Sequence, residues 1–223
     1  GDYRALSTLR KILLNSASPF RTAAVEAIGR NAKPSEARAI LMIALASPDF
    51  QVRLKAYEML LPINSPMIDR MNVAGNFVVD SVTSSGPKVI YIYQQKNPRI
   101  VLFGAPFHCQ QNLFIQSDDG TITINAKPDD EFLSVSRKHP QRPRVLGPIS
   151  SGYEVSSLIE TLGGLPEESN DRINLRPGLA VSYAEIIPIL KKLCEIDAIP
   201  AQFIAEPPIT LDPALQNLTP IGR

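Results

Sequence analysis

The chain has 223 residues, of which 44% are hydrophobic, so it is long enough to bury the core of one large or two small domains. Its 23 lysines and arginines balance 22 aspartates and glutamates, and this formal charge of +1 excludes binding of nucleic acid or an anionic membrane by overall charge alone. The longest apolar stretch, Ile40–Ala46, stops at Ser47-Pro48, well short of the roughly 20 residues of a membrane span. We therefore expect a globular chain without a membrane span.

Two copies of a helical hairpin are expected in residues 1–66. Apolar side chains recur at helical spacing in four segments, which are Tyr3–Asn15, Phe20–Gly29, Pro34–Ala46 and Phe50–Leu61. A shift of 32 residues places Phe20 on Val52 and Ala24 on Ala56, and we expect both alanines to face inward. Gly29 is expected at the left-handed position that follows a helix.

This pattern resembles HEAT repeats, whose second helix typically begins with an apolar–arginine pair followed by small residues. Phe20-Arg21-Thr22-Ala23-Ala24 and Val52-Arg53-Leu54-Lys55-Ala56 carry the resemblance. The period is shorter than the roughly 40 to 47 residues usual for such repeats, so a short-repeat subtype, a divergent pair and an ordinary four-helix segment all stay open. Two repeats seldom bury a continuous core, and the start Gly1-Asp2 lacks an initiator methionine. We expect further repeats upstream, a cap from the following domain, or both.

A β-rich domain with two late helices is expected in residues 73–206, which makes the fold class α+β. Runs of β-branched and aromatic residues predict strands at Asn76–Val82, Val89–Gln94, Ile100–Phe103, Leu113–Gln116, Thr121–Asn125 and Phe132–Ser136. Asp118-Asp119-Gly120 predicts a hairpin turn. Residues 137–148 are expected to be an arginine- and proline-rich link.

The last part of this domain is predicted to be mainly helical. Helices are expected at Tyr153–Gly163 and Ser182–Ile196, followed by a strand at Ala201–Ala205 that joins the sheet. In the second helix, Ile186, Ile187, Leu190, Leu193 and Cys194 form the expected buried stripe, whereas Lys191, Lys192 and Glu195 are expected to face solvent or a neighbouring subunit. The tail 207–223, with four prolines, is expected to be disordered.

The residues offer little catalytic or metal-binding chemistry. His108-Cys109 is the one place where two types of metal ligand adjoin, but a structural zinc site needs about four ligands. Neighbouring side chains on a strand point to opposite faces, so His108 is a poor base for Cys109. Cys109 and Cys194 are expected to be free thiols, with a disulfide as the alternative. We expect no catalytic residue, no metal site and no intrinsic cofactor.

A cluster of positive charge marks the candidate partner-binding residues, which are Arg137, Lys138, Arg142 and Arg144. Four permanent charges within eight residues attract phosphate or an acidic protein surface. The neighbourhood lacks the aromatic side chains that stack on nucleic-acid bases, so we expect a protein contact or a solvated link and no nucleic acid.

The segment Ser182–Leu193, continued by Cys194–Ile204, resembles the C-terminal part of bacterial flagellar P-ring proteins. That family has an amphipathic helix followed by a short strand, and Tyr153–Gly164 is similar to the helix that precedes them. Asp197 stands where the family pattern leads us to expect a glycine. The resemblance implies a non-catalytic structural subunit of the envelope ring around the flagellar rod, which associates side by side in the periplasm or cell envelope and uses no cofactor.

Three classes of function stay open at this point. One is a ring-forming structural subunit that resembles the P-ring. The second is a HEAT-type scaffold for protein–protein interaction in an unrelated pathway, with a cytoplasmic location as the alternative. The third is an enzyme in the β-rich domain, which would need His108, Cys109 and an acidic residue to converge in one pocket.

Overall fold

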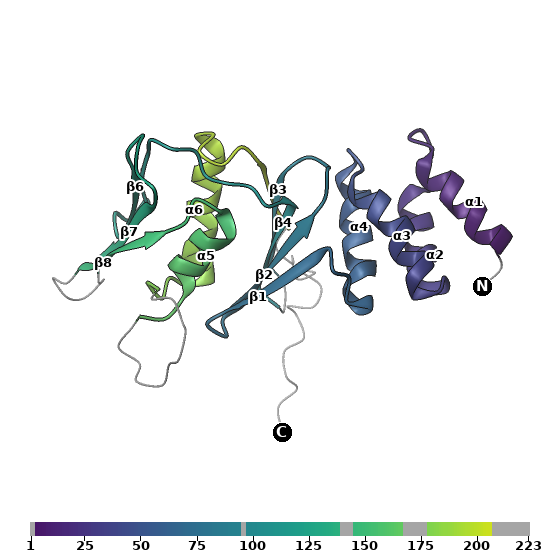
Figure 1. Ribbon diagram of the computed structural model, residues 1–223, viewed down its shortest axis with the longest axis horizontal. Coiled ribbons are helices and arrows are strands. Elements are labelled where there is room, and N and C mark those ends of the chain that lie inside the picture. Colours follow the sequence, from purple (N-terminus) through teal and green to yellow (C-terminus); the bar gives the residue numbers. More distant parts are fainter. Residues whose placement is uncertain (1–2, 95–96, 139–144, 167–177, 207–223) are drawn as a thin grey trace, which may run out of the picture.

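The computed structural model describes residues 3–94, 97–138, 145–166 and 178–206, and it has an α+β fold. Four helices come first, a β-rich region follows, and two further helices lie late in the chain (Figure 1). The helices are α1 Tyr3–Leu14, α2 Arg21–Asn31, α3 Pro34–Leu45, α4 Phe50–Leu60, α5 Val155–Gly163 and α6 Tyr183–Glu195, with a 3₁₀ turn, η1, at Leu61–Ile63. The strands are β1 Ile68–Val73, β2 Phe77–Thr83, β3 Val89–Tyr93, β4 Arg99–Ala105, β5 Leu113–Gln116, β6 Ile122–Ala126, β7 Leu133–Lys138, β8 Val145–Ser151 and β9 Gln202–Ala205.

The four N-terminal helices pack in chain order, and α2 also packs on α4. Ala24 of α2 and Ala56 of α4 are both buried, as the 32-residue shift predicts. The prediction for Gly29 is wrong, because α2 continues through it to Asn31. A Cβ atom at Gly29 would lie 2.6 Å from the side chain of Met59 in α4, so this glycine permits the close approach of the two helices.

Each of the two matched arginines contacts the next unit along the chain. Arg21 donates a hydrogen bond from Nη2 to Oγ of Ser47, in the loop before α4, at 2.9 Å. Arg53 is buried and donates to the carbonyl oxygen of Pro87, in the loop before β3. Each arginine therefore joins its own helix to a later segment of the chain, and strands of the β-region share a core with α4.

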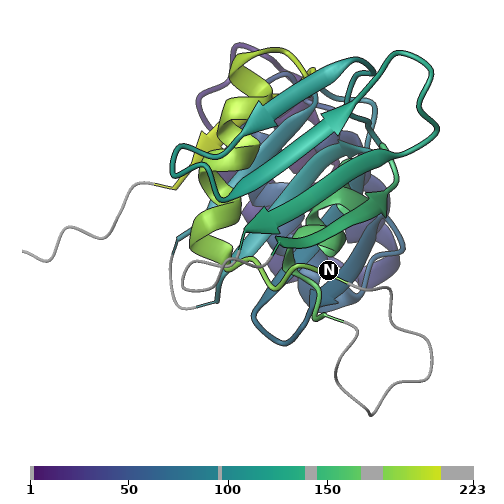
Figure 2. The same ribbon diagram turned by 90° about the vertical axis from the view of Figure 1, so that its left-hand side faces the viewer.

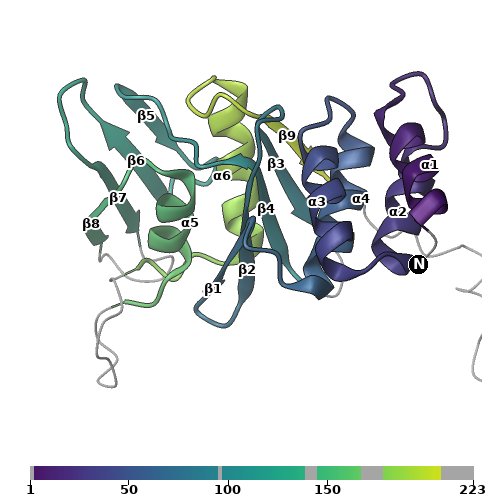
Figure 3. The same cartoon turned by 45° about the vertical axis from the view of Figure 1, so that its right-hand side comes forward.

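A five-stranded sheet with the order β1-β2-β4-β3-β9 lies against these helices (Figure 3). Because successive side chains of a strand point to opposite faces, its central strands serve two cores. Val89, Tyr91, Val101 and Phe103 pack with the helices, whereas Ile90, Ile92, Ile100 and Leu102 pack on the other face. Burial on both faces joins the helical region and the β-region into one body.

A four-stranded antiparallel sheet, with the order β5-β6-β7-β8, forms the opposite end of the molecule (Figure 2). Helices α5 and α6 lie between the two sheets (Figure 1). The Asp118-Asp119-Gly120 turn joins β5 to β6 as predicted, with Gly120 at φ +70°. Strand β9 pairs with β3, and α6 packs on it, which confirms the expected return of the chain to the sheet.

Several elements differ from the predictions. The link expected at residues 137–148 is wrong, because β7 extends to Lys138 and β8 begins at Val145. Strand β1 was not predicted at all; only Val73 in it is fully buried. In α6 the stripe also includes Ile189, and Ile187 and Cys194 are only half-buried. The tail 207–223 lies outside the described residues.

One buried acid joins the helices to the five-stranded sheet. Asp80 of β2 is fully buried, accepts a hydrogen bond from the Tyr57 hydroxyl of α4, and pairs with Arg70 of β1 through two bonds of 2.7 and 2.8 Å. Arg99 of β4 donates to the Tyr57 hydroxyl at 3.0 Å. Burial, followed by the contact with Asp80, raises the pKa of Tyr57. The hydroxyl thus stays protonated as the donor that connects α4 to the sheet.

Candidate partner-binding groove

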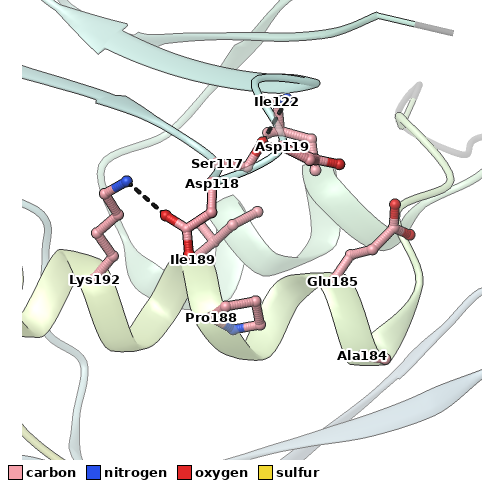
Figure 4. Close-up of a pocket in the computed structure, with 9 residues that line it drawn as sticks. All are labelled: Ser117, Asp118, Asp119, Ile122, Ala184, Glu185, Pro188, Ile189 and Lys192. Carbon is pink, nitrogen blue, oxygen red and sulfur yellow. Dashed lines mark hydrogen bonds and ion pairs between the residues drawn. The ribbon is translucent and has the colours of Figure 1, made fainter. Parts of the chain in front are cut away.

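The β5–β6 turn and helix α6 enclose a groove of about 310 Å³ (Figure 4). Its lining residues are Ser117, Asp118, Asp119 and Ile122 from the hairpin and Ala184, Glu185, Pro188, Ile189 and Lys192 from α6. The apolar members come from both sides, Ile122 from the hairpin and Ala184, Pro188 and Ile189 from the helix, and Asp118 and Asp119 lie in the hairpin turn (Figure 4). Such a combination of apolar surface with a few polar groups is typical of a binding site.

Helix α6 presents its groove-lining residues at positions 184, 188 and 192, one turn apart, so they share one face of the helix. Pro188 has no N–H to donate to the carbonyl oxygen of Ala184, four residues earlier. The ring of Pro188 therefore lines the groove, and the carbonyl oxygen of Ala184 lacks its usual helical donor.

Lys192 closes one end of the groove. Its ammonium donates to the carbonyl oxygen of Gln116 at 2.8 Å and pairs with Asp118 at 3.0 Å. Lys192 therefore combines the exposure that the helical pattern predicts, with 39% of its side chain exposed, with a contact to the hairpin that the pattern does not predict. The other end, beside Ala184 and Glu185, lies at the start of α6 (Figure 4).

Glu185 belongs both to the start of α6 and to the rim. Its carboxylate accepts from the backbone N–H of Ser182, while the Ser182 hydroxyl accepts from the N–H of Glu185, which forms a capping box. It also pairs with Arg137 of β7 at 2.8 Å. Burial opposes ionisation, but the bonds from Ser182 and the charge of Arg137 hold the pKa of Glu185 below its usual value.

The carboxylate of Asp119, at the rim of the groove, accepts hydrogen bonds but forms no ion pair with a described residue. It accepts from the Ser117 hydroxyl at 2.6 Å and from the backbone N–H of Thr121 at 3.0 Å, and these bonds lower the pKa of Asp119 to about 2. Among the described residues, no lysine or arginine pairs with it. The groove therefore carries one ionised acid that has no cationic partner in the described part of the chain.

The predicted partner-binding residues are only partly placed by the structure. Arg137 has just 15% of its side chain exposed and donates to the carbonyl oxygen of Leu179 as well as pairing with Glu185, so its contacts lie within the molecule. Lys138 is exposed at the end of β7. Arg142 and Arg144 lie outside the described residues. Arg137 therefore contributes to the groove through Glu185, while binding of a partner by Lys138 stays a prediction.

The residues considered for cysteine chemistry do not converge. His108 is exposed and Cys109 is 5% exposed, as the alternation of side chains predicts. Both Cys109 and Cys194 are free thiols, and burial raises the pKa of Cys109 to about 12. The described residues include no group of three or more His, Cys, Asp or Glu arranged to hold a metal ion.

Sequence reasoning missed the groove, because its two walls are far apart in the chain. Comparisons with known protein families, with curated proteins and with solved structures found no match for the chain. No helix among the described residues has the length and apolar character to cross a membrane.

Proposed function

We propose that the chain is a non-enzymatic structural or assembly protein that associates side by side with further copies, as its resemblance to P-ring subunits implies. The observation that carries the proposal is the continuous layered body with exposed aromatic side chains at two different ends. A subunit that binds one neighbour at each end needs a continuous folded body between its two binding surfaces. The periplasmic or cell-envelope location belongs to the same proposal.

The two ends present different surfaces. At the four-stranded sheet, Phe114 is 70% exposed because Leu113 and Ile115 on either side of it point into the core. At the helical end, Phe20, which precedes α2, is 66% exposed. Exposed aromatic side chains are enriched in protein interfaces. Contacts between two unlike surfaces are heterologous, and they close into a ring when the rotation between subunits permits it.

A HEAT-type scaffold is the second candidate, favoured by the packing of α2 on α4 beside the chain-ordered contacts of the helices. In that case the same surfaces bind a different protein, and the chain alone is monomeric. Self-association of the pure protein separates these two proposals.

The test is sedimentation velocity over a range of protein concentration, with the variants Phe20→Ser and Phe114→Ser. We expect the unmodified chain to form species larger than a dimer. A heterologous contact needs one end of each kind, and each variant keeps only one kind intact. Each variant alone should therefore be monomeric, and an equimolar mixture should form dimers and nothing larger. Ile196→Ser, which removes a 53% exposed apolar side chain at the end of α6, is the matched control and should assemble normally. A strict monomer at every concentration would reject side-by-side assembly.

A further inference from the structure

The charge of the chain is divided unevenly between its two ends. Helix α1 and the four-stranded sheet lie at opposite ends of the molecule (Figure 1). Residues 3–33, which contain α1 and α2, have six lysines and arginines and a single glutamate. Residues 113–138, which contain β5 to β7, have five acids and three cations, and one of these cations, Arg137, pairs with Glu185. The helical end is therefore basic and the sheet end is acidic.

The α1–α2 tip, residues 10–20, is both apolar and basic. The side chain of Phe20 is 66% exposed. Arg10 and Lys11, near the end of α1, are also exposed, and neither pairs with an acid in the described part of the chain. Arg21 donates from Nε to a backbone carbonyl oxygen near the end of α1 at 3.1 Å. The exposed ring at the start of α2 is thus held beside the two cations of α1.

The groove complements this tip in size, apolar character and charge. Its volume of about 310 Å³ is ample for one aromatic side chain, and Pro188 and Ile189 provide an apolar contact. The other two acids that line it each pair with a cation of the same chain. Asp119 has no cationic partner among the described residues. A cation brought by a bound partner would therefore balance the one acid that the described chain leaves unpaired.

The exposed ring of Phe114 belongs to the same end of the molecule as the groove. Phe114 lies in β5, two residues before Gln116, whose carbonyl oxygen accepts the hydrogen bond from Lys192 at the closed end of the groove. The groove therefore adjoins the sheet surface that the proposed assembly uses.

We propose that the groove binds the α1–α2 tip of a second copy of the chain, with the Phe20 ring against Pro188 and Ile189 and with Arg10 and Lys11 facing Asp119. This contact rests on the proposed side-by-side assembly and names the two surfaces that meet in it. A chain cannot fill its own groove, because the tip lies at the opposite end of the molecule. Opposite charges on the two surfaces favour this orientation over contacts between like ends. The contact is heterologous, so it leaves a free tip and a free groove for the next copies.

Charge reversal in the full chain, measured by sedimentation velocity, tests the contact. Arg10→Glu with Lys11→Glu places an acidic tip against an acidic groove, and Asp119→Lys places a basic groove against a basic tip. Each variant alone should need a concentration at least about tenfold higher to assemble. An equimolar mixture of the two variants should assemble like the unmodified chain, because every tip then meets a groove of opposite charge.

Matched variants separate the contact from a general effect of charge or folding. Arg30→Glu with Lys33→Glu reverses two exposed cations at the other end of α2, and Asp129→Lys reverses an exposed acid in the turn between β6 and β7. Both should assemble normally. Ala184→Trp fills the groove from the exposed start of α6 and leaves the turn of Asp119 intact. It should weaken assembly as Asp119→Lys does.

The possible failures lead to different conclusions. A strict monomer of the unmodified chain would overturn both the proposed function and this contact. If the unmodified chain assembles and the tip variant, Asp119→Lys and Ala184→Trp assemble equally well, the proposed function stands and the groove contact is overturned. Weakened assembly that the mixture of the two charge-reversed variants does not restore would also overturn the contact.

Discussion

Removal of the Asp80 carboxylate should loosen the junction between α4 and the five-stranded sheet. In Asp80→Ala, the buried Tyr57 hydroxyl loses its acceptor, which costs about 1–3 kcal/mol. Arg99, with 19% of its side chain exposed, loses its nearest carboxylate at 3.7 Å. Arg70 is 49% exposed and can turn to water, so its share is below about 1 kcal/mol. The expected loss of unfolding free energy is therefore about 3 kcal/mol, close to the lower end measured for broken buried ion pairs.

Equilibrium unfolding in urea, followed by far-ultraviolet circular dichroism, measures this loss. With a slope of about 2 kcal/mol per molar, the midpoint should fall by about 1.5 M. Asp69→Ala, which removes an exposed acid from the adjacent strand β1, is the matched control and should change stability by less than about 0.5 kcal/mol. Tyr57→Phe should cost about 1 kcal/mol, and its combination with Asp80→Ala should cost less than the sum. A loss in Asp80→Ala no larger than in Asp69→Ala would refute the structural role of the acid.

Three further outcomes are expected. Ala56→Leu should overpack the helical core and lower the free energy of unfolding by about 1–3 kcal/mol, measured by thermal denaturation. Ala5→Leu, on the exposed side of α1, is the control and should leave stability unchanged. Equal melting temperatures for the two variants would contradict the burial of Ala56. Cys109, with a pKa near 12, should react with iodoacetamide at neutral pH only after denaturant is added, as mass spectrometry can follow. The carboxylate of Asp119 should titrate near pH 2 in NMR spectra; because its pKa is lowered in the fold, its contribution to the turn is present above pH 4 and fades as the pH falls toward 2. A midpoint near 4 would show that the turn does not hold it.

The helices and the central strands were predictable because local sequence determines them. Apolar spacing predicted all four N-terminal helices to within about two residues at most ends. The capping residues of α6 lie together as Ser182 and Glu185, in the order that a capping box requires. Asp197 ends the turn after α6 in the left-handed conformation, with φ +58°, which aspartate adopts more readily than most residues.

Two of the four edge strands, β1 and β8, were not predictable in the same way, whereas the edge strands β5 and β9 were predicted. Strand β1 alternates weakly and exposes half of its residues, and β8 contains Gly147 and Pro148, which are typical of turns. Both strands are held by backbone pairing with a neighbour, β2 and β7 respectively. Pairing of this kind depends on the partner strand and leaves little trace in the side chains of the edge strand.

The groove escaped prediction because it is a product of distant contacts. The pair formed by Lys192 and Asp118 joins residues 74 positions apart, and no local pattern reports that distance. The role of Arg137 escaped prediction for the same reason. In the sequence its charge is part of a basic cluster, which predicted a contact with a partner. In the fold, Glu185 and the carbonyl oxygen of Leu179 already engage it.

The acidic residues at the rim of the groove differ in how much each contributes to the fold. Glu185 caps α6 and pairs with Arg137, so a change there disturbs the helix start and the four-stranded sheet together. Asp118 holds Lys192 and with it the closed end of the groove. Asp119 lies on an exposed turn and takes no part in the hydrophobic core, so a change of its charge disturbs the turn that Ser117 and Thr121 form with it and leaves the core in place. Charge reversal at Asp119 therefore acts where a change in binding is least confounded by a change in folding.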